Sequence, residues 1–257
     1  MIKYGLKIWS SNTDWFDEAA RRHRRGEFDF AEIYSNSAVT HDYEALKKLQ
    51  PIPVLAIHVG NLDAAGFHAF FLTEEQKPAW NMTVALTDFF SAPKIVVHPA
   101  ITHTEETFWE NIAKLNDERI VIESMPVVSP LGGPERMFGA AVADLARIGE
   151  RREVVIDIEK SIKAAVYYGL DYKKFLPDMF EKIRTSYFHI SGCTIDHPVD
   201  EHGNLWDADF DLAWMKQQLE ALALERDIWL VFETPKEGKG LENDVKNMEY
   251  FRELKLK

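Results

Sequence analysis

Six short apolar runs in this sequence each end in a histidine, an aspartate or a glutamate. These side chains bind metal ions through nitrogen and oxygen, and they transfer protons in catalysis. They make up about one residue in five of the chain, so chance seldom places them at the ends of six runs. In chain order they are His58, His98, Glu123, Asp157, His189 and Glu233. We therefore treat them as candidates for one site.

The apolar runs before these residues do not alternate with polar residues. Runs such as VLAI before His58 and WLVF before Glu233 indicate strands buried on both faces, which is typical of a parallel sheet covered by helices. The residue that closes such a strand lies where the strand meets its following loop. Because parallel strands bring their carboxyl ends to one face, we expect the six side chains to converge there.

Eight apolar runs alternate with helical patterns, and no linker or change of composition marks a boundary. This alternation predicts one (β/α)8 TIM barrel domain over residues 1–257, with an open doubly wound sheet as the alternative. Strands are expected at 4–10, 28–34 and 187–190, and in runs that end at residues 58, 98, 123, 157 and 233. Helices are expected at 14–25, 42–49, 74–90, from 104, near 134, at 172–182, at 209–225 and from 242.

The composition excludes several classes of protein. A single cysteine, Cys193, excludes an internal disulfide framework and a cysteine-rich zinc site. No signal-peptide pattern opens the sequence, and no stretch approaches the roughly 18 apolar residues of a membrane span. We expect a cytoplasmic protein that does not enter a membrane. The net charge of −12 argues against a large basic surface for nucleic acid, although bound metal ions would add local positive charge.

Other residues could join the site. Asp200 and His202 lie two positions apart in the loop after His189, where a carboxylate and an imidazole can bind one ion together. His197 is close to them in sequence, and its role stays open. Glu32, in the second expected strand, points either into the barrel or away from it.

This set of nitrogen and oxygen ligands suits zinc, or alternatively manganese, iron or cobalt. Carboxylates can bridge two ions. Two ions about 3.5–4 Å apart would polarise a phosphoryl group and hold a hydroxide nucleophile at neutral pH. One ion would instead bind the oxygen atoms of a sugar.

The order of these residues resembles that of the endonuclease IV family, the metal-dependent apurinic-site nucleases of the xylose isomerase-like barrel superfamily. The resemblance extends from about residue 55 to about residue 235 and implies a site for three zinc ions. The implied ligands are His58, His98 and Glu123 for the first ion, Glu123, Asp157, His189 and Glu233 for the second, and Asp200 and His202 for the third.

One position departs from the family's pattern. In the family, the remaining ligand to the third ion is a histidine three residues after the aspartate that closes the sixth strand. That aspartate corresponds to Asp157 here, and this chain has Lys160 at the histidine's position. A protonated ammonium group cannot bind zinc, so we expect two ions, with Lys160 replacing part of the third ion's charge and contacting the substrate. The alternative is an ion pair of Lys160 with Asp200 or Glu159. With Lys160, Glu123 and Glu233 are the expected catalytic residues.

These residues leave three functions open. A phosphoester hydrolase would use the whole set, and His58, His98, Asp200 and His202 favour it. A sugar isomerase, epimerase or dehydratase of the same superfamily needs only the quartet Glu123, Asp157, His189 and Glu233. A barrel that binds a metal or ligand without catalysis is the third. Duplex DNA is a weakly supported partner, because few cations are expected in the loops at the carboxyl ends of the strands, which form the mouth of the barrel. The expected mouth cations are Arg136, Lys160, Lys163, Lys236 and Lys239.

Overall fold

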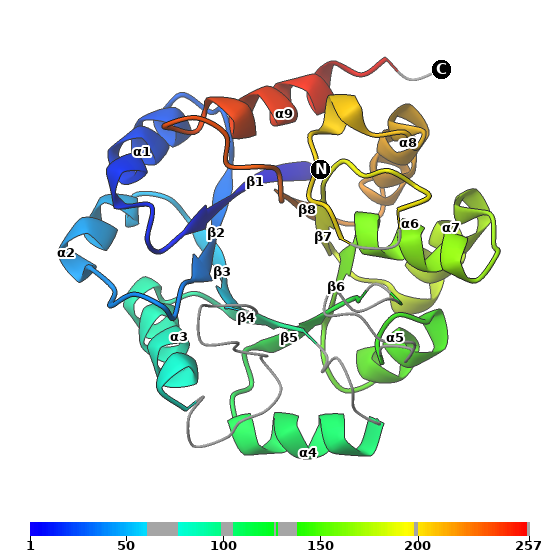
Figure 1. The fold of residues 1–257 in the computed structure, drawn as a ribbon, viewed down its shortest axis with the longest axis horizontal. Helices are drawn as coiled ribbons and strands as arrows, with labels where there is room; N and C mark the ends of the chain where they lie inside the picture. The colour runs from blue at the N-terminus through cyan, green and yellow to red at the C-terminus, as the bar shows by residue number, and fades with distance from the viewer. Residues whose placement is uncertain (61–76, 99–104, 126, 128–137, 198–199, 256–257) are drawn as a thin grey trace.

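The computed structural model describes residues 1–60, 77–98, 105–125, 127, 138–197 and 200–255, in which eight parallel strands form a closed barrel (Figure 1). Each strand pairs with the next one in the sequence, and β8 pairs with β1 to close the ring. The (β/α)8 prediction is confirmed. The strands are β1 (Ile2–Trp9), β2 (Phe30–Ser35), β3 (Val54–Val59), β4 (Lys94–Val97), β5 (Ile120–Glu123), β6 (Val154–Asp157), β7 (Tyr187–Ile190) and β8 (Ile228–Phe232).

Helices surround the barrel (Figure 1). The α-helices are α1 (Phe16–Arg24), α2 (Tyr43–Leu46), α3 (Lys77–Phe90), α4 (Glu105–Leu115), α5 (Val142–Gly149), α6 (Ile158–Tyr167), α7 (Tyr172–Ile183), α8 (Leu212–Leu222) and α9 (Glu242–Glu253). Short 3-10 turns lie at Thr13–Trp15, Lys47–Leu49 and Leu205–Asp207. Among the described residues, no helix is long and apolar enough to cross a membrane.

The expected elements agree with the structure except at their ends and at one helix. Residues 74–76, residue 104 and the segment around Pro134, where helices were expected to begin, lie outside the described residues. The helix α6 was not expected, because no loop separates it from β6. Asp157 ends the strand and also caps the helix, since its side chain accepts a hydrogen bond from the backbone N–H of Lys160 at 3.1 Å.

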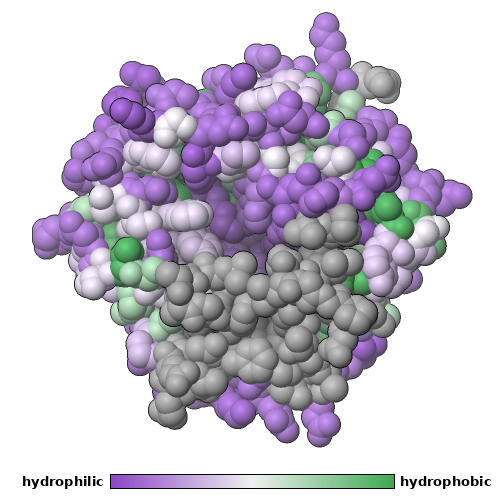
Figure 2. Space-filling view, viewed as in Figure 1, coloured by the Kyte–Doolittle hydropathy of each residue, from purple (hydrophilic) through white to green (hydrophobic). Residues whose placement is uncertain are grey.

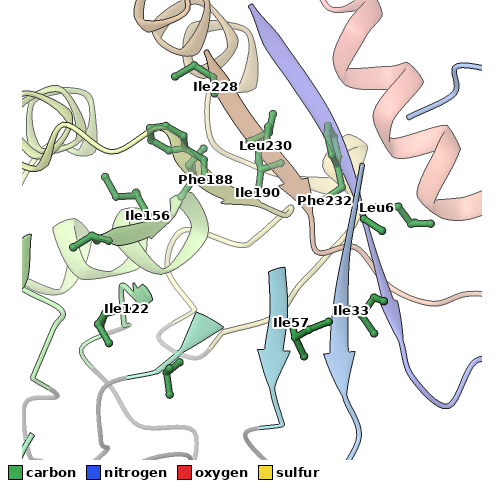
Figure 3. Close-up of a cluster of buried hydrophobic side chains, with 14 of the residues drawn as sticks. Leu6, Ile33, Ile57, Ile122, Ile156, Phe188, Ile190, Ile228, Leu230 and Phe232 are labelled. Carbon is green, nitrogen blue, oxygen red and sulfur yellow. The ribbon is translucent and has the colours of Figure 1, made fainter. Parts of the chain in front are cut away.

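The inside of the barrel is filled by one layer of apolar side chains. This cluster consists of strand residues alone and contains Phe30, Ala56, Val96, Val121, Val155, Tyr187 and Val231. The alternate residues, such as Ile57, Ile122 and Ile156, belong to the larger cluster that includes the surrounding helices (Figure 3). Gly5 leaves room for the Phe30 ring, because a Cβ atom at this position would overlap the ring carbons.

The layer of apolar residues inside the barrel determines where the candidate site lies. Side chains two positions apart on a strand point to the same face, so the residues two positions further along also face the barrel interior. Those residues are Glu32, His58, His98, Glu123, Asp157, His189 and Glu233. In the view of Figure 2, the centre of the molecule is hollowed and hydrophilic where the grey atoms leave it visible.

Candidate metal centre

Glu123 lies at the centre of the candidate site. Its side chain is fully buried, and its Oε2 atom lies 2.9 Å from His58 Nε2 and 2.8 Å from His98 Nε2. His189 Nδ1 is 3.5 Å from the same oxygen. Strands β3, β5 and β7 and the residue that follows β4 therefore bring three imidazoles to one carboxylate, as the convergence of strand ends predicts.

A second group of possible ligands shares this carboxylate. One ligand atom from each of Glu123, Asp157, His189 and Glu233 lies within 4.8 Å of the others. His189 Nδ1 is 2.9 Å from Glu233 Oε1. Because Glu123 belongs to both groups, it is placed where a bridging carboxylate between two ions would stand.

Asp200 and His202 lie beside the second group, on the loop that follows β7. His202 Nε2 is 3.3 Å from Asp200 Oδ2 and 2.9 Å from Glu233 Oε2. Glu159 completes a third cluster with them. Its oxygens, however, accept hydrogen bonds from Ser191 Oγ and from the backbone N–H groups of Glu201 and His202. We therefore interpret Glu159 as the residue that holds this loop.

The tautomer of His58 provides a test of whether the residues fit a metal ion. Its Nδ1 atom lies 2.8 Å from the carbonyl oxygen of Val59, which only accepts, so Nδ1 carries the proton. Burial, with a further effect from the positive charge of Lys7, lowers the pKa of His58 to about 3, and the ring is neutral. The lone pair of Nε2 therefore faces the Glu123 carboxylate. A cation between these two acceptors removes their repulsion, so this pair fits a metal ion.

His189 is held between carboxylates on both sides of its ring. Burial alone would lower its pKa, but the charges of Glu32 and Glu123 outweigh it and raise the pKa of His189 to about 9. Its Nε2 atom lies 3.0 Å from Glu32 Oε2. A proton on Nε2 bonded to Glu32 leaves the Nδ1 atom as the one that can bind a metal. Binding there displaces the second ring proton.

Glu32 and Lys7 belong to this site, and the sequence patterns did not establish either. Glu32 points into the barrel and accepts hydrogen bonds from Tyr187 Oη and His189 Nε2. Lys7 pairs with Glu233, and its Nζ atom is 3.1 Å from Glu32 Oε1. Burial would raise the pKa of Glu32, but His189 and Lys7 outweigh it and lower that pKa, so Glu32 stays charged. Their signal was available in the spacing, since Lys7 and Glu32 follow inward-facing Gly5 and Phe30 by two residues.

Lys160 reaches the centre of the site from the first turn of α6. Its side chain is buried and pairs with Glu123, while its Nζ atom lies 3.2 Å from Asp157 Oδ2 and 3.6 Å from Asp200 Oδ2. Burial would lower the pKa of Lys160, but these three carboxylates raise it well above its usual value. The pairing with Asp200, one of the two in the alternative interpretation of Lys160, is therefore present. The alternative pairing with Glu159 is not, because Lys163 is the lysine beside Glu159, at 3.6 Å.

Two of the other expected mouth cations, Lys163 and Lys236, are engaged in ion pairs within the protein. Lys163 is buried, and its Nζ atom donates to the carbonyl oxygen of His197 and to the Glu201 carboxylate, both at 2.7 Å. Lys236 pairs with Asp244. Lys239 is exposed, and Arg136 lies outside the described residues. His197 is exposed and does not belong to a possible ligand group among the described residues.

Two glycines fix the loop that carries Asp200 and His202. The backbone N–H groups of Gly192 and Gly203 donate to each other's carbonyl oxygens at 2.8 and 2.7 Å. A Cβ atom at Gly192 would overlap the carbonyl group of Asn204. His202 has a φ of 50°, a left-handed conformation that side-chain-bearing residues rarely adopt. Such strain is typical of residues that are held in place for a function.

The fold and the ligand geometry together define a (β/α)8 barrel with a buried candidate metal centre at the carboxyl ends of its strands. No family model matches the sequence, and no curated protein matches it.

Solved structures share the fold. Endonuclease IV from Thermus thermophilus aligns with a TM-score of 0.69 and 18% identity over 97% of both chains. A xylose isomerase domain containing protein from Salmonella typhimurium aligns with a TM-score of 0.60 and 16% identity over 96% of this chain and 94% of the other. A sugar phosphate isomerase/epimerase from Parabacteroides distasonis aligns with a TM-score of 0.56 and 10% identity over 100% of this chain and 98% of the other. The fold implied by the resemblance is thereby confirmed.

The contact between Glu32 and His189 predicts that Glu32→Gln weakens metal binding without unfolding the barrel. The amide cannot supply the charge that fixes the imidazole, and loss of such a partner typically lowers metal affinity by roughly 10–100-fold. Competition with a chromophoric zinc chelator measures the affinity. Glu150 is exposed, so the Glu150→Gln variant is the matched control and should bind zinc as the parent protein does. Equal zinc affinity in the Glu32→Gln and parent proteins would contradict this role.

The Gly192–Gly203 bridge predicts that Gly192→Ala destabilises the protein. The added methyl group has no space, and overpacking of this kind costs about 1–3 kcal/mol in free energy of unfolding. Chemical denaturation followed by circular dichroism measures the change. Gly149→Ala is the control, since a Cβ atom at Gly149 meets nothing within 4 Å. Similar stabilities of the two variants would show that the bridge is not tightly packed.

Proposed function

We propose that this protein is an enzyme, a divalent-metal-dependent phosphoester hydrolase with two bound ions. The observation that supports this best is the position of Glu123, which is shared by two groups of possible ligands. We assign His58 and His98 with Glu123 to one ion, and Asp157, His189 and Glu233 with Glu123 to the other. Zinc suits these ligands, and manganese, iron or cobalt are alternatives.

In this proposal the two ions supply charge for the phosphoryl group and activate a water molecule. The protein's own residues do the rest. Lys160 carries a buried positive charge beside Glu123 and Asp157, where it can bind an oxygen of the phosphoryl group. Glu233, next to His202, can accept the proton of the attacking water molecule. Glu123, Lys160 and Glu233 are therefore the proposed catalytic residues.

Asp200 and His202 have a different proposed role from that implied by the family resemblance. Lys160 Nζ lies 3.6 Å from Asp200 Oδ2, so an ammonium group is where the third ion's remaining ligand would stand. We propose that Asp200 and His202 orient Lys160 and Glu233 and do not hold a stoichiometric third ion.

The described part of the mouth supports a small substrate better than duplex DNA. Lys163 and Lys236 are already paired within the protein, and the net charge is −12. Duplex-binding enzymes neutralise several phosphates with free lysine and arginine side chains. We therefore propose a small phosphoester as the substrate.

A sugar isomerase is the second candidate, and one observation favours it. The quartet of Glu123, Asp157, His189 and Glu233 satisfies the geometry of a single-ion site by itself. In that case Glu123 and Glu233 would act as acid and base on a sugar. The number of bound ions and the reaction separate the two candidates.

Protein purified without added metal is expected to contain about two divalent ions per chain by elemental analysis. With zinc or manganese present it is expected to cleave p-nitrophenyl phosphate or bis(p-nitrophenyl) phosphate. Glu123→Gln should lower this activity at least about a hundredfold, because it removes the shared charge. Glu106→Gln, an exposed residue on α4, is the control. One ion per chain together with interconversion of ketoses would support the isomerase instead.

Lys160→His is expected to raise the metal content towards three ions per chain, because it replaces a competing positive charge by a ligand. Lys160→Ala should lower phosphoester hydrolysis roughly 10–100-fold without adding metal. Lys174→His, an exposed residue on α7, controls for adventitious binding to a new histidine. Three stoichiometric ions in the parent protein, or full activity in Lys160→Ala, would contradict this role.

A further inference from the structure

A row of aromatic rings leads from the candidate metal centre to the surface of the mouth. The Tyr34 ring stacks on the ring of His58 with centroids 5.6 Å apart, and Trp9 lies against Tyr34 at 5.3 Å. The three residues are neighbours in the barrel register, because Trp9 pairs with Tyr34 and Tyr34 pairs with His58. Trp9 is therefore two ring spacings from a possible metal ligand.

Trp9 is exposed although its neighbours in β1 are buried. Its exposed fraction is 42%, whereas residues Gly5 to Ile8 are buried. Tyr167 and Tyr250, the other exposed aromatic residues in the described chain, lie on helices α6 and α9. Trp9 is thus the one exposed aromatic residue at the carboxyl end of a described strand, on the face of the barrel that holds the site.

Side chains in the loops that follow β1 and β2 hold those loops by hydrogen bonds. Asn12 Oδ1 accepts a hydrogen bond from the backbone N–H of Trp9 at 2.9 Å. Asn36 donates to Ser11 Oγ at 3.2 Å and accepts from the backbone N–H of Ala38 at 3.1 Å. The exposed indole ring of Trp9 can offer its face to a ligand at this position. Such a face binds planar aromatic rings by stacking.

We propose that Trp9, supported by Tyr34, is a ring-stacking subsite, and that the substrate is a phosphoester whose alcohol part carries a planar aromatic ring, such as a nucleobase. This inference rests on the proposed hydrolase, because the metal centre and Lys160 would hold the phosphoryl group. Stacking supplies affinity here, where Lys163 and Lys236 are engaged in ion pairs within the protein.

The test compares two phosphoesters that differ only in the ring. The holoenzyme should hydrolyse adenosine 5′-monophosphate with a kcat/KM roughly ten- to a hundredfold above that for ribose 5-phosphate, the range expected of one base stacked on an aromatic residue. Trp9→Ala should reduce this ratio to near one, mainly through KM, and Trp9→Phe should retain most of it. Tyr167→Ala, at the end of α6 away from the mouth, should leave the ratio unchanged.

Binding of adenosine, which has no phosphoryl group, makes the subsite testable without hydrolysis. Calorimetry should detect adenosine binding to the metal-loaded parent protein and at least about tenfold weaker binding to Trp9→Ala, with equal metal content in the two proteins. If phosphoesters are cleaved but Trp9→Ala keeps the ratio, or lowers both substrates equally, the subsite is wrong and the hydrolase stands. If adenosine binds through Trp9 but no phosphoester is cleaved, the subsite stands and the proposed hydrolase is wrong.

Discussion

The structure depends on the burial of a carboxylate, that of Glu123, at the centre of a barrel. A charge in such a place is tolerated only if it is paired and hydrogen-bonded. Lys160 contacts one of its oxygens, and His98 and His189 lie beside the other. Its pKa is lowered well below the usual value despite burial, because His98, Lys160 and His189 outweigh the cost of desolvation. The site is thus built to keep Glu123 ionised.

The same requirement explains the cations that surround the other carboxylates. Glu32 and Glu233 are buried and share Lys7, and Glu32 also accepts a hydrogen bond from His189. Protons and ammonium groups balance the negative charge in this arrangement. A divalent ion that enters has to displace some of them, so metal binding and proton release are linked. In our proposal Lys160, which is part of the chain and cannot dissociate, limits the number of ions that the site can hold.

Much of the fold and part of the site could be predicted from the sequence. The eight strands, and the convergence of residues such as His58 and Glu233, follow from apolar runs and from the geometry of parallel strands. The roles assigned to these residues stay predictions. Lys7 and Glu32 were not placed, because they lie inside their strands and do not close an apolar run. Lys163, and not Lys160, contacts Glu159 because α6 begins directly after β6. The sequence did not predict this start, since no loop residues separate the two elements.

Asp157 connects the chemistry of the site to the integrity of the helix that follows it. One of its oxygens caps α6, and the other, Oδ2, faces Lys160 Nζ at 3.2 Å inside the site. Opening of the first turn of α6 would break the hydrogen bond from the Lys160 N–H to Asp157 and would move the Lys160 side chain out of the site. Solvent exchange of the amide hydrogens in this turn and release of a bound ion would then proceed through one local opening. A bound ion would slow both processes. The rate of amide hydrogen exchange in the first turn of α6 would therefore report whether the metal centre is occupied.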